Sequence, residues 1–264
     1  MDHQDEYYDN LITMLELIWG EGYMTPGGSD NVEKMFNGIE TAGKRILDIG
    51  CGLGGQAFEM VNTFGADVVG IDLEAPLIKR ATETATKMGL QDRCKFLTVT
   101  AGALDFPNQS FDIVASSGAI TQIKDKANIF RECYRVLKPG GRVAIADIVS
   151  DESVPQHLQD NEELWTGCIS GAFQEKQFAQ AFLDAGFVLV NYDKWDQHPW
   201  QVVEGIEFRS VTLMAVKPSP QECLDIGQAV IYKGPYSEVR DDEGHIYPRG
   251  DRIAVCERSF KMLM

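Results

Sequence analysis

Along most of the chain two patterns of apolar residues follow one another in turn. One is the short continuous run that is typical of a buried strand, and the other is the three-to-four-residue spacing of an amphipathic helix. Helices are expected over residues 6–19, 30–40, 54–64, 75–88, 125–137 and 174–185. Strands are expected over residues 44–49, 67–72, 95–99, 111–116, 142–147, 187–192 and 210–216. Because parallel strands that alternate with helices need crossover connections, this order predicts an α/β fold whose sheet is covered on both faces.

Breaks in these patterns divide the chain into three parts. Four glycines and a proline within residues 20–28 separate the leading helix from the sheet, and Lys217-Pro218-Ser219-Pro220 follows the last expected strand. The tail holds two strand-like runs, 229–232 and 252–256, on either side of a polar, turn-prone segment. We therefore predict an N-terminal helical lid over residues 1–40, a central α/β domain over 41–217 and a small β-rich C-terminal appendage over 218–264.

The most informative motif stands where the first strand meets the next helix. A buried run, residues 46–49, leads into the glycine-rich residues 50–55, and the following strand ends in Asp72. Glycines let a ligand approach the backbone closely, because they have no Cβ and tolerate positive φ. A carboxylate at the tip of the second strand suits a ribose diol. The motif therefore predicts a nucleotide-like ligand.

Asp48 decides between two such ligands. The spacing Gly50-x-Gly52-x-x-Gly55 also matches the dinucleotide fingerprint. A carboxylate two residues before the first glycine repels a pyrophosphate at the helix N-terminus, whereas it attracts a ligand that carries an ammonium and a sulfonium. S-adenosylmethionine is such a ligand, so the sequence favours it over NAD.

Composition narrows the possible partners. The 264 residues carry a net charge of −16, whereas nucleic acid or an anionic membrane surface requires a basic footprint. No apolar run approaches the roughly 20 residues of a membrane span, and the acidic N-terminus is unlike a signal peptide. We predict a cytoplasmic enzyme, monomer or homodimer, with a small-molecule acceptor and no nucleic-acid or membrane partner. The six cysteines form no C-x-x-C pair and the four histidines no paired spacing, so no metal site is predicted.

Over about residues 20–217 the chain resembles class I S-adenosylmethionine-dependent methyltransferases. The resemblance rests on residues 48–55, 70–72, 105–107, 110–112 and 134–141. It implies a Rossmann-like, seven-stranded, mostly parallel sheet with an antiparallel final strand. It also implies that Asp48 and the backbone of the glycine turn hold the methionine moiety and that Asp72 bridges the ribose hydroxyls, while the backbone near Ala103 borders the adenine. The cofactor-binding residues carried over are Tyr23, Thr25, Asp48, Gly50, Cys51, Gly52, Asp72, Leu73, Ala103 and Ser117.

One position departs from the family pattern. Many relatives place an aspartate where this chain has Gly102, and that acid accepts a hydrogen bond from the adenine amino group. Asp105, three residues further along, is the nearest acid on the C-terminal side. We expect the cofactor to bind still, less tightly or through a water, and Gly102 is equally well explained as a glycine at a strand end.

Two narrower resemblances point to different acceptors, and the first lies in the N-terminal lid. Tyr7-Tyr8 and residues 19–28 resemble the lid of phosphoethanolamine and glycine-type N-methyltransferases. Tyr7 matches, by its spacing, a lid tyrosine that pairs in those enzymes with a histidine after the fourth strand, and this makes Tyr7 one candidate catalytic residue. That histidine is replaced here by Gln122, which is no general base, and an amine-contacting aspartate is replaced by Gly118.

The second resemblance, to arsenite methyltransferases, covers residues 164–173, residues 209–212 and the cysteine-containing tail. It makes Cys168 the other candidate catalytic residue, because thiolates bind a soft trivalent metalloid well. The lone pair of the metalloid attacks the methyl group in line, so no strong general base is needed, which is consistent with Gln122. The third active-site cysteine of that family would fall near residues 204–206, where none stands.

The sequence as a whole predicts an S-adenosylmethionine-dependent methyltransferase that acts by in-line displacement on a small molecule. A soft nucleophile such as arsenite is the favoured acceptor. The alternatives are a small-amine N-methyltransferase in which Tyr7 contributes, and a non-enzymatic cofactor-binding protein that kept the fold. An NAD-linked oxidoreductase is disfavoured by Asp48.

Overall fold

The computed structural model describes residues 3–25, 27–161, 164, 167–219 and 227–264, and for residues 3–9 the backbone alone. The chain forms two units, one of residues up to Ala101 and one of residues from Gly102 onward. In the part described, no helix is both long enough and apolar enough to span a membrane.

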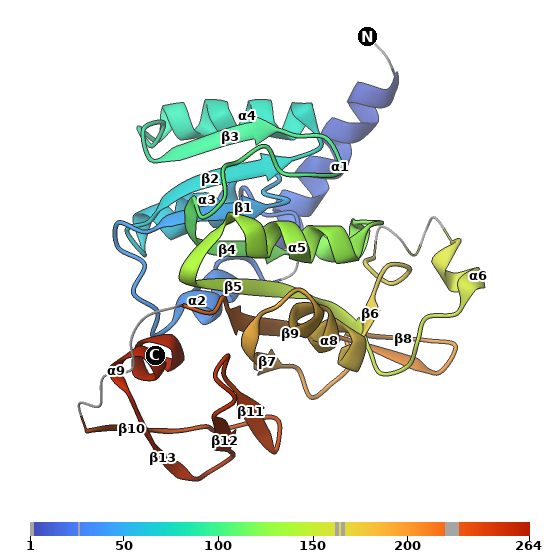
Figure 1. Ribbon diagram of the computed structural model, residues 1–264. Helices are drawn as coiled ribbons and strands as arrows, with labels where there is room; N and C mark the ends of the chain where they lie inside the picture. Colours follow the sequence, from blue (N-terminus) through green and yellow to red (C-terminus); the bar gives the residue numbers. More distant parts are fainter. Residues whose placement is uncertain (1–2, 26, 162–163, 165–166, 220–226) are drawn as a thin grey trace. The chain divides into compact units, whose positions relative to one another are not determined.

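The described residues of the first unit form three parallel strands and four helices (Figure 1). Its elements are α1 (His3–Trp19), α2 (Gly28–Phe36), β1 (Arg45–Ile49), α3 (Gly55–Asn62), β2 (Asp67–Asp72), α4 (Ala75–Lys87) and β3 (Cys94–Thr98). The strands lie in the order β3-β2-β1, with Val69 of β2 between Leu47 of β1 and Lys95 of β3. Four of the five residues of β1 and four of the six of β2 are buried, as in parallel strands covered on both faces.

The second unit carries the other main strands. Its elements before the tail are β4 (Phe111–Ser117), η1 (Ile120–Gln122), α5 (Lys126–Val136), β5 (Leu137–Ser150), α6 (Gln156–Gln159), β6 (Phe173–Gln174), α8 (Glu175–Asp184), β7 (Val188–Trp195), β8 (Gln201–Val203) and β9 (Ile206–Val216). The main strands lie in the order β4-β5-β9-β7, while β6 pairs with β5 and β8 with β9. The β4–β5 pair is parallel, whereas β9 is antiparallel to both β5 and β7.

Aromatic side chains hold α5 and α8 of the second unit together. Neighbouring ring centroids lie between 4.7 and 6.2 Å apart, within the range of favourable aromatic pairs, among Phe130, Phe173, Phe178, Phe182 and Phe187. Phe130 belongs to α5 and Phe178 and Phe182 to α8, while Phe173 lies in β6 and Phe187 just before β7.

The fold class expected from the sequence is confirmed. Each of the expected helices and strands has a counterpart in one of the two units. Among the described residues the main strands are mostly parallel, and β9, the last of them along the chain, is antiparallel, as in Rossmann-like methyltransferase sheets.

The structure differs from the expected elements at several ends and in short segments. Helix α2 ends at Phe36 rather than residue 40, because Gly38 follows with a positive φ of 78°. Residues 138–141, expected as a turn, belong to β5, whose pairing passes from Leu137 to Arg142 across an irregularity. The elements η1, α6, β6 and β8 were not expected, since two to four residues are too few to produce a period.

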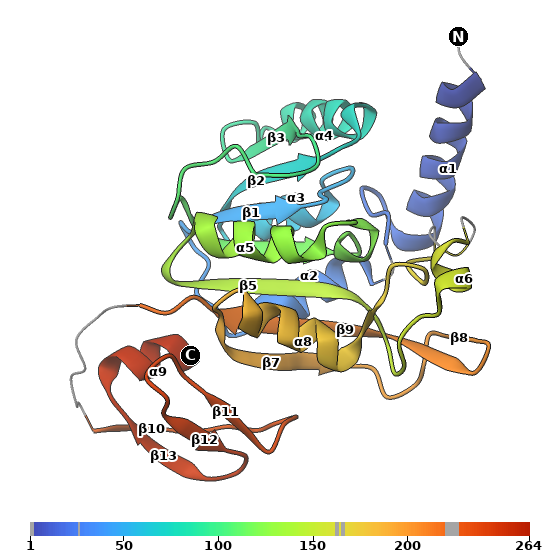
Figure 2. The same ribbon diagram turned by 45° about the vertical axis from the view of Figure 1, so that its right-hand side comes forward.

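The C-terminal tail forms a group of short elements, drawn in orange to red in Figure 2. They are β10 (Gln228–Ile231), β11 (Glu238–Arg240), β12 (Ile246–Pro248), β13 (Arg252–Val255) and α9 (Glu257–Leu263). The two expected runs pair as the antiparallel β10–β13, and a second antiparallel pair, β11–β12, flanks the turn-prone segment. The pair β11–β12 and helix α9 were missed, because each is short and lacks a clear alternation.

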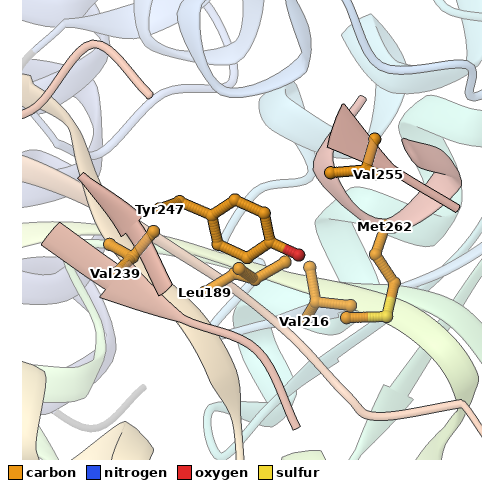
Figure 3. Packing of buried hydrophobic residues seen from close by; sticks show 6 residues of the cluster. All are labelled: Leu189, Val216, Val239, Tyr247, Val255 and Met262. Atoms are coloured by element: carbon orange, nitrogen blue, oxygen red, sulfur yellow. The ribbon is translucent and has the colours of Figure 1, made fainter. Parts of the chain in front are cut away.

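The tail packs against the β7 and β9 strands of its own unit. Figure 3 shows the ring of Tyr247 at the centre of a buried cluster formed by Leu189, Val216, Val239, Tyr247, Val255 and Met262. Leu189 comes from β7 and Val216 from β9, while the other members belong to the tail. Arg142 of β5 adds a hydrogen bond from its Nη2 to the carbonyl of Met262, at 3.0 Å.

Candidate functional site

The glycine turn of the first unit is fixed by its backbone. The N–H groups of Gly50 and Cys51 both donate to the carbonyl of Ile71, at 2.8 and 3.0 Å, so the turn is tied to the end of β2. Gly52 has a φ of 52°, and a Cβ there would lie 3.2 Å from the sulfur of Met24. A side chain at this position would be strained and crowded, so the turn requires glycine.

Asp72 lies beside this turn at the end of β2. Its Oδ2 accepts the N–H of Gly52 at 2.9 Å, and its Oδ1 accepts the N–H of Glu74 at 3.0 Å. Each carboxylate oxygen has a second lone pair after these bonds. The carboxylate is therefore oriented by the backbone and can still accept the hydroxyls of a diol.

Asp48, near the end of β1, is the most unusual group of the turn. Its residue is 1% exposed, and its Oδ1 accepts the Nε2 of Gln56 at 3.0 Å. Its Oδ2 has no hydrogen-bond partner among the described residues. Burial, with a smaller contribution from the nearby Asp72, raises the pKa of Asp48 to about 7 against the opposing effect of the hydrogen bond from Gln56. A buried acid with one unpaired oxygen fits a ligand that brings a positive charge.

The loop that follows α1 lies on the glycine turn. The N–H of Gly55 donates to the carbonyl of Gly22 at 3.0 Å, and a Cβ on Gly55 would lie only 2.5 Å from that oxygen. The N–H of Gly22 is held in turn by Glu16 of α1, at 2.9 Å. The apolar contact beneath the loop is a small cluster formed by Ile12, Leu53, Leu77 and Met24. The loop after α1 is thus in direct contact with the glycine turn, and its role as a lid stays a prediction.

Two candidate cofactor residues stand on this loop. Burial, together with the nearby carboxylates of Glu59 and Asp48, raises the pKa of Tyr23 to about 12, so Tyr23 lies close to the buried acid. Thr25 is half-buried. Leu73, just after Asp72, is 56% exposed. The side chain of Tyr7 lies outside the described residues, so its catalytic role stays a prediction.

The remaining candidates belong to the second unit. Ser117 ends β4, and the N–H of the next residue, Gly118, donates to Ala146 of β5 at 2.8 Å. Ala103 is exposed, and Gly102 has a φ of 129°, a conformation that favours glycine over aspartate. The missing acid at 102 therefore has a backbone explanation.

Cys168 lies against the segment that follows β4. It has a positive φ of 58°, which is rare for a residue with a side chain, and its Sγ lies 3.9 Å from the carbonyl of Gly118. Thr121 and Gln122 are close enough to lower its pKa by hydrogen bonding, but burial and the charge of Asp147 raise it by more. Cys168 therefore carries a neutral thiol near pH 7 rather than the thiolate that the sequence suggested.

Asp147 is a buried acid next to this thiol. Its Oδ2 accepts the N–H of Thr121 at 3.1 Å and its Oδ1 that of Ile148 at 2.8 Å. Burial raises its pKa to about 6, and the backbone hydrogen bonds oppose the rise. The side chain is thus ionised at neutral pH and fixed within β5, which runs on to Ser150. Sequence reasoning missed it, although its place at a strand end in a parallel sheet was a signal.

Four other cysteines lie in the part of the chain that the structure describes. Cys51, Cys94, Cys133 and Cys256 are all buried. Cys256 caps α9, where its Sγ accepts the N–H of Ser259 at 3.4 Å. Cys223 and Trp165 lie outside the described residues. Within those residues no group of three His, Cys, Asp or Glu side chains could hold a metal ion.

Comparison with known proteins identifies the family. The model of a methyltransferase domain matches residues 40–186, more than half of the chain. The chain belongs to this methyltransferase family. The resemblance that the sequence motifs suggested is thereby confirmed. Residues 219–264 match a separate model, described as a domain of unknown function (DUF8838).

Curated relatives of this methyltransferase have different acceptors in their names. Phosphoethanolamine N-methyltransferase 3 of Arabidopsis thaliana is 35% identical over 151 residues, which cover 57% of this chain and 30% of the relative. The arsenite methyltransferase of Aquipseudomonas alcaligenes is 28% identical over 243 residues, covering 84% of this chain and 70% of the relative. The chain thus spans less than a third of the length of the plant relative.

The similar solved structures likewise include enzymes named for phosphoethanolamine and for arsenic. The phosphoethanolamine N-methyltransferase 2 of Haemonchus contortus, in complex with S-adenosyl-L-methionine, is 25% identical with a TM-score of 0.69, over 81% of this chain and 58% of that one. The arsenic(III) S-adenosylmethionine methyltransferase of Chlamydomonas reinhardtii is 23% identical with a TM-score of 0.62, over 96% of this chain and 91% of that one. The second likeness is evidence of the fold alone.

Proposed function

We propose that this methyltransferase transfers the methyl group of S-adenosylmethionine to a small molecule by in-line displacement. The observation that carries the proposal is Asp48, a 1% exposed acid whose Oδ2 makes no hydrogen bond in the described part of the chain. A buried carboxylate needs either a cation or its own proton. An ammonium group satisfies that need, whereas a pyrophosphate would add repulsion.

Residues of the first unit fit the parts of this cofactor. The backbone of Gly50–Gly52 and Asp48 would hold the methionine moiety, and Asp72 would accept the ribose hydroxyls with the lone pairs it retains. Tyr23 and Thr25, on the loop above the turn, would cover the bound molecule. When bound, the cofactor supplies an electrophilic methyl group on a sulfonium sulfur.

The acceptor that we favour is a soft nucleophile such as arsenite. Two observations support it: the Cys168 thiol lies beside Gly118 and Gln122, and the arsenite methyltransferase match extends over more of this chain than the plant match does. Trivalent arsenic attacks with its own lone pair, so no general base has to remove a proton first. This is consistent with Gln122, which cannot act as a general base. Since Cys168 is a neutral thiol in the free protein, metalloid binding would release its proton.

A small amine is the second candidate, and Asp147 is the observation that favours it. This acid is 5% exposed and ionised at neutral pH, and it lies near Cys168. An ionised buried carboxylate attracts an ammonium group, and by taking one proton from it would leave the amine nitrogen the lone pair that attacks the methyl group. In this case the lid residue Tyr7 would contribute, as the resemblance to phosphoethanolamine N-methyltransferases implies.

Thermal unfolding with S-adenosylhomocysteine tests the cofactor. A ligand that binds only the native state raises the melting temperature, so S-adenosylhomocysteine should raise it and NADH should leave it unchanged. A flat response to S-adenosylhomocysteine would contradict the proposal. Cofactor binding without methyl transfer to any acceptor would favour the non-enzymatic cofactor-binding protein.

A panel of acceptors tests the substrate class. Transfer of a labelled methyl group to arsenite, simple thiols and small amines would be measured with wild type, Cys168→Ser and the buried control Cys133→Ala. We expect arsenite to be methylated, Cys168→Ser to lower that rate by about tenfold or more through loss of a soft ligand, and Cys133→Ala to keep it. Arsenite activity that survives Cys168→Ser would contradict the thiol contact, and activity on amines alone would establish the second candidate.

A further inference from the structure

We infer that Gln56 is a positioning residue for the cofactor: its amide holds one oxygen of Asp48 and so presents the other oxygen to the ammonium group of the methionine moiety. This inference rests on the proposed function. It assigns a role to a helical side chain that no motif in the sequence marked.

The contact is short and buried on both sides. Gln56 is the second residue of α3 and is 8% exposed, while Asp48 on β1 is 1% exposed. The Nε2 of Gln56 lies 3.0 Å from the Oδ1 of Asp48. With Oδ1 engaged in this way, Oδ2 is the oxygen left without a hydrogen bond in the described part of the chain. The glycine turn between the two residues places α3 so that this contact forms.

An amide at position 56 combines two properties that neither a cationic nor an apolar side chain has. Lysine or arginine would neutralise Asp48 and cancel its attraction for a cation. Leucine would leave both carboxylate oxygens unpaired, and the carboxylate free to rotate about χ2. The glutamine amide orients the carboxylate and leaves its charge for the ligand to neutralise.

The groups that face Asp48 from neighbouring elements supply no cation among the described residues. They are Tyr23 of the loop, Cys51 of the turn, Asp72 of β2 and Cys94 of β3. The free carboxyl therefore keeps its own proton below a pH of about 7, where burial has raised its pKa, and loses it above. Cofactor binding would exchange that proton for an ammonium group, so affinity should rise with pH through this range.

Calorimetric titration of S-adenosylhomocysteine between pH 5.5 and 8 tests the inference. The probe carries the ammonium group but no transferable methyl group. For wild type we expect affinity to rise with pH and then level off. In Gln56→Leu and Gln56→Met, affinity at pH 8 should fall by about tenfold, the cost of a lost hydrogen bond to a charged group. The rise should also move to higher pH, because the lost bond no longer favours the ionised form of Asp48.

Two further variants separate positioning from stability. Gln56→Glu keeps the length and polarity of the side chain but adds a carboxyl to Asp48, and such a pair holds a proton to higher pH. Its rise in affinity should therefore move to higher pH than that of wild type, a readout that remains if the apolar variants fail to fold. Thr41→Val is the matched control, because it removes a buried hydrogen bond of the same unit, Thr41 Oγ1 to the Phe64 carbonyl at 2.7 Å. It should lower the melting temperature and leave the pH profile unchanged.

The outcomes distinguish the inference from the proposed function. If wild type binds S-adenosylhomocysteine, and the folded Gln56 variants bind it with the same affinity and pH profile, Gln56 has only a structural role and the inference is wrong. If wild type fails to bind at any pH, the proposed function itself is wrong and the inference falls with it.

Discussion

In the glycine turn of the first unit, most of the groups that would meet a ligand belong to the backbone or are held by it. The N–H groups of Gly50 and Cys51 bond to β2, and Asp72 is oriented by two backbone N–H groups. In the second unit most of the groups around Cys168 are side chains, those of Thr121, Gln122 and Asp147, and the carbonyl of Gly118 is the one backbone group described there. The geometry of the first region is set by the positions of the strand ends and glycines, which are local features of the sequence. The geometry of the second region depends on which side chains the tertiary fold brings together from distant parts of the chain.

The difference explains why the cofactor is easier to assign than the acceptor. Few sequences can form a binding turn built from backbone groups. The glycines and the two acids of this turn are therefore enough to predict the kind of ligand that it binds. A site built from side chains changes its chemistry with one substitution. By the resemblance to amine-specific N-methyltransferases, Gln122 and Gly118 stand where those enzymes have a histidine and an aspartate. Relatives with arsenite and phosphoethanolamine in their names accordingly share one domain with this chain.

The largest effect on the backbone-built region should come from Asp72→Ala. The variant removes the proposed acceptor of the ribose hydroxyls and frees the N–H of Gly52, so we expect affinity for S-adenosylhomocysteine to fall by about a hundredfold, the sum of two hydrogen bonds to a charged group. Calorimetric titration measures it. Asp67→Asn, an exposed carboxylate at the other end of β2, is the control and should bind as wild type does. Equal affinities for the two variants would break the assignment of Asp72.

A smaller effect is expected from Gly55→Ala, which tests how the loop after α1 is held against the glycine turn. The new Cβ would lie 2.5 Å from the carbonyl of Gly22, so the loop must move, at a cost of about 1–3 kcal/mol in the free energy of unfolding. Chemical denaturation measures the change. The matched control is Gly167→Ala, where the nearest atom is 3.6 Å away and little change is expected. Similar stability of the two variants would show that the loop does not depend on this close approach.

The smallest effect is expected when the side-chain-built region is changed and cofactor binding is measured. Cys168→Ala removes the thiol but no group of the glycine turn, so the dissociation constant of S-adenosylhomocysteine should stay within about a factor of two of wild type, as for a site without shared partners. A large loss of affinity would show that the two regions are not separable in the way described above.

Particular residues show how far the sequence could be interpreted. The strand-glycine-helix motif predicted β1, α3, β2 and the places of Asp48 and Asp72, because strand periodicity and glycine conformation are local properties. The role of Gln56 was missed, because its contact with Asp48 depends on how α3 packs on β1 and not on the spacing of the two residues along the chain. The neutral state of the Cys168 thiol was missed for the same reason: burial and the approach of Asp147 depend on the tertiary fold.

The tail shows a different limit of prediction. Strands β10 and β13 were expected from their apolar runs, but β11 and β12 have three residues each and α9 has seven. Their stability comes from packing around Tyr247 and against Leu189 and Val216, contacts distant in sequence. Elements that depend on such contacts have no local signal strong enough to predict them.

The measurement that tests the central claim most directly is the number of protons released when S-adenosylhomocysteine binds. Burial raises the pKa of Asp48 to about 7, so the free protein carries a proton there at pH 6.5 that an ammonium ligand must displace. Titrations at pH 6.5 in two buffers of different ionisation enthalpy should show net proton release for wild type and a clearly smaller release for Asp48→Asn. Equal release from the two proteins, or binding of NADH in place of S-adenosylhomocysteine, would contradict the assignment of this acid to a cationic nucleoside.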